Sequence, residues 1–233
     1  MVYSYLRKPP SIAFQDLLYG TVFTGIGLFF HFRFSRNRIE QFLAYHRNLQ
    51  IQRDLIVSSS FDSLSELLVR ARFFAMADTV LRGRQDNSYI ALCIVDLDEF
   101  KHINDCFGHQ MGDKAIQTAG KIIWETLEED VSEKWSFCER AVLEGKSFAG
   151  RLGGDEFVIF LRKDADWDSA HDRLKKILDA LNAVELGEMH GIQASLGVVD
   201  LAPGDKDIDS AYTRADRVLY DAKKNGKNQI IKG

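Results

Sequence analysis

The longest uncharged stretch of the chain lies near its beginning. Residues 17–32 contain no Asp, Glu, Lys or Arg and several phenylalanines. A bilayer crossing needs about 20 mostly apolar residues, so a spanning helix requires the longer range 12–34, with polar residues near its ends. Basic residues are more numerous after this run than before it, which predicts an inner (cytoplasmic) membrane location with the remaining chain in the cytoplasm. The alternatives are a buried helix and a signal-peptide core, the latter disfavoured because no Ala-x-Ala-like site follows.

A second helical pattern follows the apolar run. Apolar residues fall near heptad a and d spacing, with polar residues at two intervening positions: Ile39, Phe42, His46, Leu49, Arg53 and Ile56. This pattern predicts a short dimeric stalk, and a polar amphipathic linker is the alternative. Three serines at 58–60 then mark a boundary. The predicted organisation is a candidate transmembrane segment in 1–34, a stalk or linker in 35–60 and a globular domain in 61–233.

The globular part alternates between strand and helix patterns. Strands are predicted at 89–95, 148–151, 157–161, 192–199 and 229–231. Helices are predicted at 112–127, 165–184 and 209–224, and an earlier helix is predicted to begin at Asp62 or Ser63 and continue to Leu81, with Glu66 completing a capping box. The range 128–147 has no clear period and is predicted to be a surface excursion. This order of elements predicts an α/β sheet with helices on its faces.

Composition limits the classes of function. The chain has 233 residues, 45% apolar and 27% charged, which suits one medium-sized domain with an appended segment. Its net charge of −4 disfavours a broadly basic nucleic-acid surface, so a nucleotide is the expected substrate and no nucleic acid is expected as a partner. Its cysteines, Cys93, Cys106 and Cys138, have no metal-like spacing and are interpreted as reduced cytosolic thiols.

Two acidic motifs carry the candidate chemistry. An apolar run ends in Asp96, as when a buried strand delivers a carboxylate to the edge of a sheet. Far along the chain, two glycines form a turn that carries Asp155 and Glu156 ahead of another apolar run. If the two strands are neighbours, Asp96 and Glu156 meet, and their oxygens suit Mg²⁺. Either motif alone would be compatible with an ordinary acidic loop.

Together the motifs resemble a known family. The sequence Asp-Leu-Asp-Glu-Phe-Lys-x-x-Asn-Asp-x-x-Gly-His-x-x-Gly-Asp from residue 96, followed by Gly-Gly-Asp-Glu-Phe from residue 153, is similar to that of the GGDEF diguanylate cyclases. The resemblance covers roughly residues 58–232. It implies a palm-like α+β fold, preceded here by the transmembrane or stalk helix, and a homodimer that joins two GTP into cyclic di-GMP. The alternative is a weak or inactive domain that binds GTP or cyclic di-GMP as a regulatory module.

The resemblance also implies roles for individual residues. Asp96, the backbone carbonyl of Leu97 and Glu156 would hold Mg²⁺ or Mn²⁺. Asp155 would lie beside the attacking hydroxyl, as a base or by orienting it. The positions implied to bind substrate are Asn104 and Asp113 for guanine, and Lys101, Lys223, Lys227 and the backbone of Glu99 and Phe100 for phosphates.

The sequence departs from the family pattern in three places. A Gly-Lys-Asn ending at Lys227 replaces Gly-Arg-Asn, so a bidentate fork becomes a point charge. The segment at the start of the domain carries Ser65, Glu66 and Val69 in place of Thr, Gly and Asn. Many members have an inhibitory product site built from Arg-x-x-Asp six residues ahead of the first motif glycine. Here those positions are Glu144 and Ser147, so no inhibitory site of that kind is expected.

Overall fold

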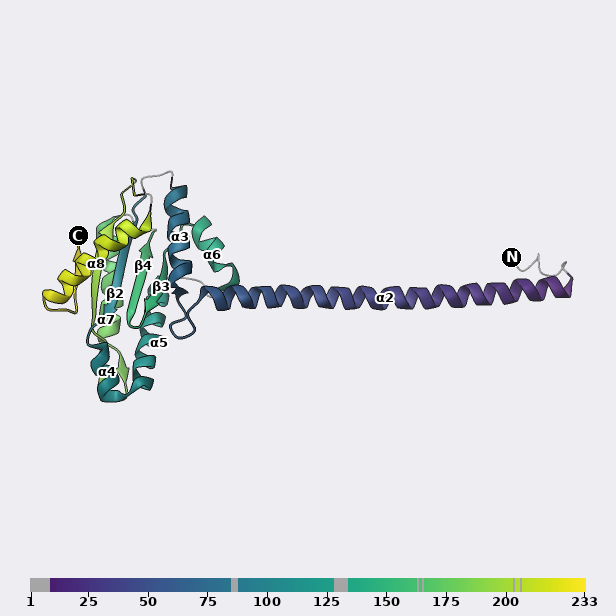
Figure 1. Cartoon of the computed structure of the whole chain (residues 1–233), viewed down its shortest axis with the longest axis horizontal. Helices are drawn as coiled ribbons and strands as arrows, with labels where there is room; N and C mark the ends of the chain where they lie inside the picture. Colours follow the sequence, from purple (N-terminus) through teal and green to yellow (C-terminus); the bar gives the residue numbers. More distant parts are fainter. Residues whose placement is uncertain are drawn as a thin grey trace. The chain divides into compact units, whose positions relative to one another are not determined.

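The computed structural model describes residues 9–84, 88–127, 134–162, 164, 166–202, 204–205 and 207–233. The chain divides into two compact units, one ending at Arg53 and one running from Asp54 to Gly233. The second unit contains the sheet and both acidic motifs (Figure 1).

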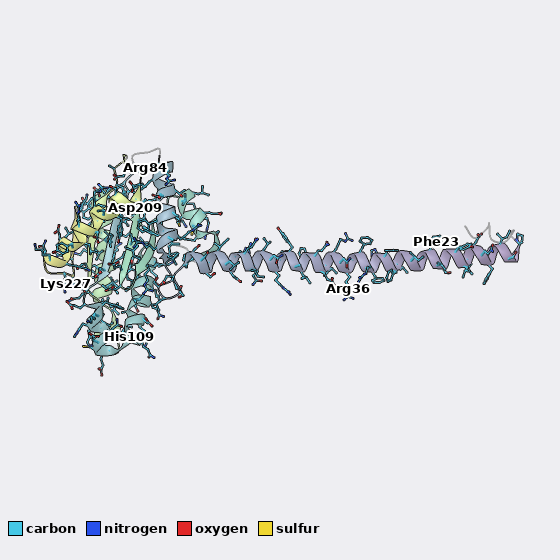
Figure 2. The ribbon with its side chains drawn as sticks, viewed as in Figure 1. Phe23, Arg36, Arg84, His109, Asp209 and Lys227 are labelled. Carbon is cyan, nitrogen blue, oxygen red and sulfur yellow. The ribbon has the colours of Figure 1, made fainter. Side chains whose placement is uncertain are left out.

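Helix α2 (Pro10–Ser60) is continuous through the apolar run and the predicted stalk. Among the described residues it is the one helix that is long and apolar enough to cross a membrane. Its side chains, including Phe23 and Arg36, project outward along the helix (Figure 2). The serines at 58–60 belong to the last turn, where the Ser58 hydroxyl donates to the Leu55 carbonyl at 3.1 Å, and the helix ends at Ser60.

The second unit is built on a mixed six-stranded sheet, as predicted for the fold class. Its strands, in spatial order, are β1 (Leu68–Val69), β3 (Phe148–Gly153), β4 (Glu156–Leu161), β2 (Ala91–Leu97), β7 (Ala194–Asp200) and β8 (Ile230–Lys232). The four central strands pair antiparallel, whereas β1 and β8 pair parallel to their neighbours at the two edges. A separate small hairpin consists of β5 (Glu185–Leu186) and β6 (Met189–His190).

Helices pack around this sheet. They are α3 (Arg70–Gly83), α4 (Phe100–Phe107), α5 (His109–Thr126), α6 (Lys134–Leu143), α7 (Trp167–Asn182) and α8 (Ile208–Lys224). Helices α3 and α8 contact each other, and α8 also covers β7 and β2, while α5 contacts α7. In Figure 1, α4 and α5 lie at the lower end of the sheet, where the acidic end of β2 leads into α4.

The helix predicted to begin at Asp62 begins instead at Arg70, so that prediction was wrong. One Asp62 carboxylate oxygen accepts bonds from the Ser65 amide and hydroxyl, both at 2.8 Å, and closes a turn rather than a helix. Glu66 has a left-handed backbone, with φ 61°, which interrupts helical geometry. The next two residues form β1 because their backbone pairs with β3. Tertiary pairing therefore overrides the helical spacing of the apolar residues.

The prediction of an irregular excursion at 128–147 was also wrong in part, because α6 occupies residues 134–143. Its Phe137, Cys138 and Ala141 are buried. The Phe137 ring lies 4.9 Å from the Trp124 ring, so the helix covers the α5 side of the core. Residues 128–133 of the predicted excursion lie outside the described residues. The short helix α4, which directly follows the first acidic motif, was not predicted.

The sheet and α8 meet closely at Gly197 of β7. A Cβ atom at this position would lie 2.3 Å from the Leu219 backbone nitrogen and 2.6 Å from the Ala215 carbonyl oxygen. Only glycine lets the helix backbone approach the strand at this distance. Because α8 ends at Lys224, this contact also sets where the lysines at its carboxyl end lie relative to β2.

Candidate active site

The acidic motifs meet at the ends of two central strands of the sheet, as the sequence predicted. Strands β2 and β4 are neighbours, and Asp96 is directly opposite Glu156 in their antiparallel register. Directly opposed residues on an antiparallel pair project on the same face with their Cβ atoms about 5 Å apart. Asp96 is buried, and Glu156 is partly exposed. Two carboxylates from distant parts of the chain therefore lie side by side at one end of the sheet, which we call the rim.

The turn between β3 and β4 is held by an arginine whose role no sequence motif revealed. Gly154 has φ 54°, and the strand register shifts between Arg151 and Gly153. The Arg151 guanidinium donates two bonds to the Gly154 carbonyl, at 2.9 and 2.7 Å, and its third nitrogen lies 3.0 Å from Asp62. The turn is thus fastened to the start of the domain. Arg151 lies two residues before the first of the two glycines, and this position was the available sequence signal.

The electrostatics of the site centre on Asp96. Burial raises the pKa of Asp96 above its ordinary value, and a hydrogen bond from the Lys223 ammonium, 2.7 Å away, opposes that rise. The negative charges of Asp155 and Glu156 raise the pKa further. A buried carboxylate beside two others is a place where a cation is strongly favoured.

The donor set at this rim fits a hard divalent cation. The Asp96 and Glu156 carboxylates supply oxygen ligands, and the nearby ammonium of Lys223 shows that the site stabilises positive charge. Within the described parts of the chain, no group of three or more His, Cys, Asp or Glu side chains forms a complete metal site. Mg²⁺ is usually bound by one or two carboxylates together with water and substrate phosphates, so this two-carboxylate set is the kind it requires.

The predicted guanine-binding residues lie on adjoining helices. Asn104 belongs to α4 and Asp113 to α5, and Gly108 separates the two helices. Gly112 lies so close to Asn104 that a Cβ atom would be 2.1 Å from the Asn104 Oδ1 atom. Lys101 is on the exposed surface of α4. The absence of a side chain at Gly112 therefore leaves room for the Asn104 amide.

A second acid of the first motif, Asp98, was missed as a functional candidate. It is buried, and it accepts hydrogen bonds from the Ser195 hydroxyl and from the backbone amide of Asn228. Its neighbour Glu99 contacts the Lys227 ammonium, which holds the pKa of Glu99 below its ordinary value. The structure thus brings together Glu99 and Lys227, two of the residues predicted to line the phosphate site. The sequence signal that could have identified Asp98 was its place as the second acid of the Asp-x-Asp pattern.

Glu144 and Ser147, which stand where many family members carry the inhibitory Arg and Asp, have partners within the protein. Ser147 is fully buried, and its hydroxyl donates to the Arg162 carbonyl at 2.8 Å and accepts from the Arg162 amide at 2.9 Å. Glu144 lies 3.3 Å from Lys146. The Ser147 hydroxyl therefore joins the residue just before β3 to the residue just after β4, and its hydrogen bonds are made within the fold.

A sequence match identifies the family to which this fold and site belong. The chain matches the family described as "Diguanylate cyclase, GGDEF domain" over residues 59–136 and 140–229, and it belongs to that family. It is 28% identical to diguanylate cyclase DgcS of Shewanella oneidensis over 182 residues, which cover 78% of this chain and 55% of DgcS. It is 32% identical to diguanylate cyclase DgcP of Escherichia coli over 174 residues, which cover 73% of this chain and 46% of DgcP.

A solved structure shares the fold. The coiled coil and GGDEF domain of DgcB from Caulobacter crescentus, crystallised in complex with c-di-GMP, aligns with a TM-score of 0.67 and 24% identity, covering 86% of this chain and 97% of that chain. The chain spans about half the length of the curated relatives described above.

Proposed function

We propose that this chain is a diguanylate cyclase that condenses two GTP into cyclic di-GMP and two pyrophosphates. The observation that carries the proposal is the register of β2 and β4, which sets Asp96 opposite Glu156 at the rim of a family-typical sheet. In each half-reaction a 3′-oxygen forms a bond to the α-phosphorus of the other nucleotide. The bond from that phosphorus to pyrophosphate breaks, and the hydroxyl proton leaves.

GGDEF diguanylate cyclases generally use a divalent metal, and we assign Mg²⁺ or Mn²⁺ to this chain. The residues that would hold it are Asp96, Glu156 and the Leu97 carbonyl. When bound, the ion would neutralise charge on the phosphates. Asp155 lies next to Glu156 on the turn, and we assign it to orienting the attacking hydroxyl and accepting its hydrogen bond.

Guanine selection is assigned to the corner between α4 and α5. The Asp113 carboxylate would accept from the N1–H and amino group of guanine, and the Asn104 amide would bond to the ring acceptors. Adenine lacks that pair of donors, so it would leave a carboxylate without partners. The phosphates are assigned to the ammonium groups of Lys101, Lys223 and Lys227 and to the backbone N–H groups at Glu99 and Phe100.

Dimer formation follows from the reaction. Each domain holds one GTP, so two copies must meet about a two-fold axis for both bonds to form. We assign α2 to dimerisation over its polar part and to the cytoplasmic membrane over its apolar part. The length and apolar composition of this helix support the membrane assignment. GGDEF domains are in general cytoplasmic, which agrees with basic residues following the apolar run.

The rival function is a regulatory module that binds GTP or cyclic di-GMP without turnover. The altered segment around Glu66 and the Gly-Lys-Asn ending at Lys227 favour it, whereas Asp96, Asp155 and Glu156 favour the enzyme. The purified chain mixed with GTP and Mg²⁺ separates the two. An enzyme converts GTP into cyclic di-GMP and pyrophosphate, and a binding module retains GTP unchanged while still binding it in calorimetry.

A glycine substitution tests the guanine assignment. Gly112→Ala would push the Asn104 amide aside, since the added Cβ would meet its oxygen at 2.1 Å. We expect KM for GTP to rise about tenfold, the value of one lost hydrogen bond, while the melting temperature changes little. Gln110→Ala, on the exposed surface of the same helix, is the matched control. An unchanged KM in Gly112→Ala would remove Asn104 from the guanine site.

Removal of the amino-terminal helix tests its assignment. Deleting residues 1–57 is expected to give a soluble protein whose specific activity is low when dilute and rises with concentration, because stalk-driven dimerisation is lost. Specific activity would be measured over a dilution series beside the full chain in detergent. Equal activity that does not depend on concentration would contradict a dimerising stalk.

Product feedback tests the missing inhibitory site. Because Glu144 and Ser147 replace the family's Arg and Asp, cyclic di-GMP should inhibit only by competing at the active site, and raising GTP should relieve all inhibition. The measurement is a product-inhibition series at several GTP concentrations. A noncompetitive pattern that disappears in Arg140→Ala would instead reveal a relocated inhibitory site on α6.

A further inference from the structure

Asp98 is a buried acid to which the proposed chemistry gives no role. The residue is only 4% exposed. One carboxylate oxygen accepts a hydrogen bond from the backbone amide of Asn228 at 2.9 Å. The Ser195 hydroxyl lies 2.8 and 2.9 Å from the two carboxylate oxygens. Ser195 is fully buried on β7, and the Asp98 amide donates to the Gln193 carbonyl at 2.8 Å. Asp98 is therefore fixed to β7 on one side and to the turn after α8 on the other.

That turn has an unusual backbone. Gly226, Lys227 and Asn228 are consecutive residues with φ of 117°, 62° and 43°. Residues other than glycine are disfavoured at positive φ, and they adopt this conformation where surrounding contacts hold the backbone in place. The contacts here are the Asn228 amide on Asp98 and the Lys227 amide on the Ala222 carbonyl, at 3.1 Å. The Asp98 carboxylate is the charged acceptor that stabilises the turn.

Another residue with a left-handed backbone lies on the other side of the same site. Glu99, which immediately follows Asp98, has φ 54° and precedes the first turn of α4. Its carboxylate contacts the Lys227 ammonium. The turn after α8, shown by the label at Lys227 in Figure 2, and the β2–α4 connection are thus joined twice, through a buried carboxylate and through an exposed ion pair.

We propose that Asp98 is a positioning residue that holds the Lys227 turn against the β2–α4 connection, so that both sides of the triphosphate site keep one geometry. It acts as a hydrogen-bond acceptor within the protein and binds neither metal nor nucleotide. We call the hydrogen bonds of the Asp98 carboxylate to Asn228 and Ser195 the clamp. This inference rests on the proposed GTP site, since losing the clamp would weaken triphosphate binding and leave the reacting groups in place.

Substitutions in the full chain test the proposal. Asp98→Ala removes the acceptor, and we expect both KM for GTP and the dissociation constant of a non-hydrolysable GTP analogue to rise at least about tenfold. We expect kcat to change less than about threefold, because Asp96, Asp155 and Glu156 are untouched. Asp216→Ala, an exposed aspartate on α8, is the matched control and should match the unmodified chain.

Asp98→Asn tests whether residue 98 acts by accepting hydrogen bonds or through its negative charge. An asparagine oxygen can accept from the Asn228 amide while its nitrogen donates to the Ser195 hydroxyl, so the geometry survives without the negative charge. We expect this variant to stay within about threefold of the unmodified chain in KM and kcat. A loss in Asp98→Asn as large as that in Asp98→Ala would overturn the proposal, since it would show that the charge itself acts at the site.

Coupling to Lys227 gives a second criterion. If Asp98 acts through Lys227, the analogue affinities of Asp98→Ala, Lys227→Ala and the double variant must be non-additive, with the double variant no weaker than the weaker single variant. Additive losses would overturn the proposal.

Hydrogen exchange tests the clamp without any activity. In the nucleotide-free chain, the Asn228 amide should exchange at least about tenfold faster in Asp98→Ala than in the unmodified chain. Equal exchange rates would refute the clamp, whatever the enzyme does. A chain that showed this exchange difference but made no cyclic di-GMP would instead refute the proposed function. If Asp98→Ala fails to fold, Ser195→Ala replaces it, with an expected smaller increase in both exchange rate and analogue dissociation constant.

Discussion

Glu156→Gln is expected to lower kcat for cyclic di-GMP formation by about three orders of magnitude, because removing one oxygen charge from the metal site forfeits several kcal/mol of transition-state stabilisation at about 1.36 kcal/mol per decade. The side chain keeps its shape opposite Asp96 in the β2–β4 register, so the fold should be unaffected. The measurement is single-turnover formation of cyclic di-GMP, together with calorimetric titration of Mn²⁺ into the GTP-analogue complex, where Glu156→Gln should weaken binding.

Asp155→Asn is the matched variant, because it changes the adjacent carboxylate on the same turn. It should also abolish turnover, while Mn²⁺ binds the analogue complex nearly as well as in the unmodified chain. The two variants therefore distinguish a role in metal binding, assigned to Glu156, from a role in orienting the attacking hydroxyl, assigned to Asp155. Near-native rates in either variant, or equal loss of Mn²⁺ affinity in both, would contradict the roles assigned to these residues.

Gly197→Ala is expected to lower the free energy of unfolding by about 1–3 kcal/mol, the usual cost of forcing extra volume into a packed interior. The added methyl group would meet backbone atoms of α8, at 2.3 Å from Leu219 and 2.6 Å from Ala215, and backbone cannot rotate aside. Urea denaturation followed by circular dichroism measures the change. Since α8 leads to Lys223 and Lys227, KM for GTP should rise as well.

Gly83→Ala is the control for this substitution. Gly83 ends α3, and among the described residues no atom beyond its chain neighbours and the backbone of its own helix lies within 4 Å of the position that an added Cβ would take. Alanine should therefore leave stability unchanged or increase it by up to about 1 kcal/mol through helix propensity. If Gly197→Ala were as stable as Gly83→Ala, the close approach of β7 and α8 would not be a determinant of this fold.

Much of the fold could be predicted from the sequence where a local pattern coincided with burial. Strand β2 is buried along its whole length and is a continuous apolar run up to Asp96, and β4 is similar after Glu156. Helices α7 and α8 each carry an aspartate at the N-cap whose side chain accepts a backbone bond, so their beginnings were clear within two residues. Asp96 and Glu156 could be paired because each lies at one end of such a strand.

The errors occurred where long-range contacts decided the local structure. The residues after Asp62 have helical spacing, yet β1 forms because its backbone pairs with β3, which is distant in the sequence. Helix α6 has no strong period and is held by the packing of Phe137 on Trp124. The roles of Arg151 and Asp98 depend on partners far along the chain, at Asp62 and Asn228, that no local pattern identifies.

The measurement that tests the proposed function most directly is incubation of the purified full chain, in detergent, with labelled GTP and Mg²⁺, followed by chromatographic separation of the products. We expect cyclic di-GMP and two pyrophosphates for each product molecule, no product from ATP, and no product when the metal is chelated. A folded, dimeric chain that binds GTP and forms no cyclic di-GMP under these conditions would contradict the assignment of this chain as a diguanylate cyclase.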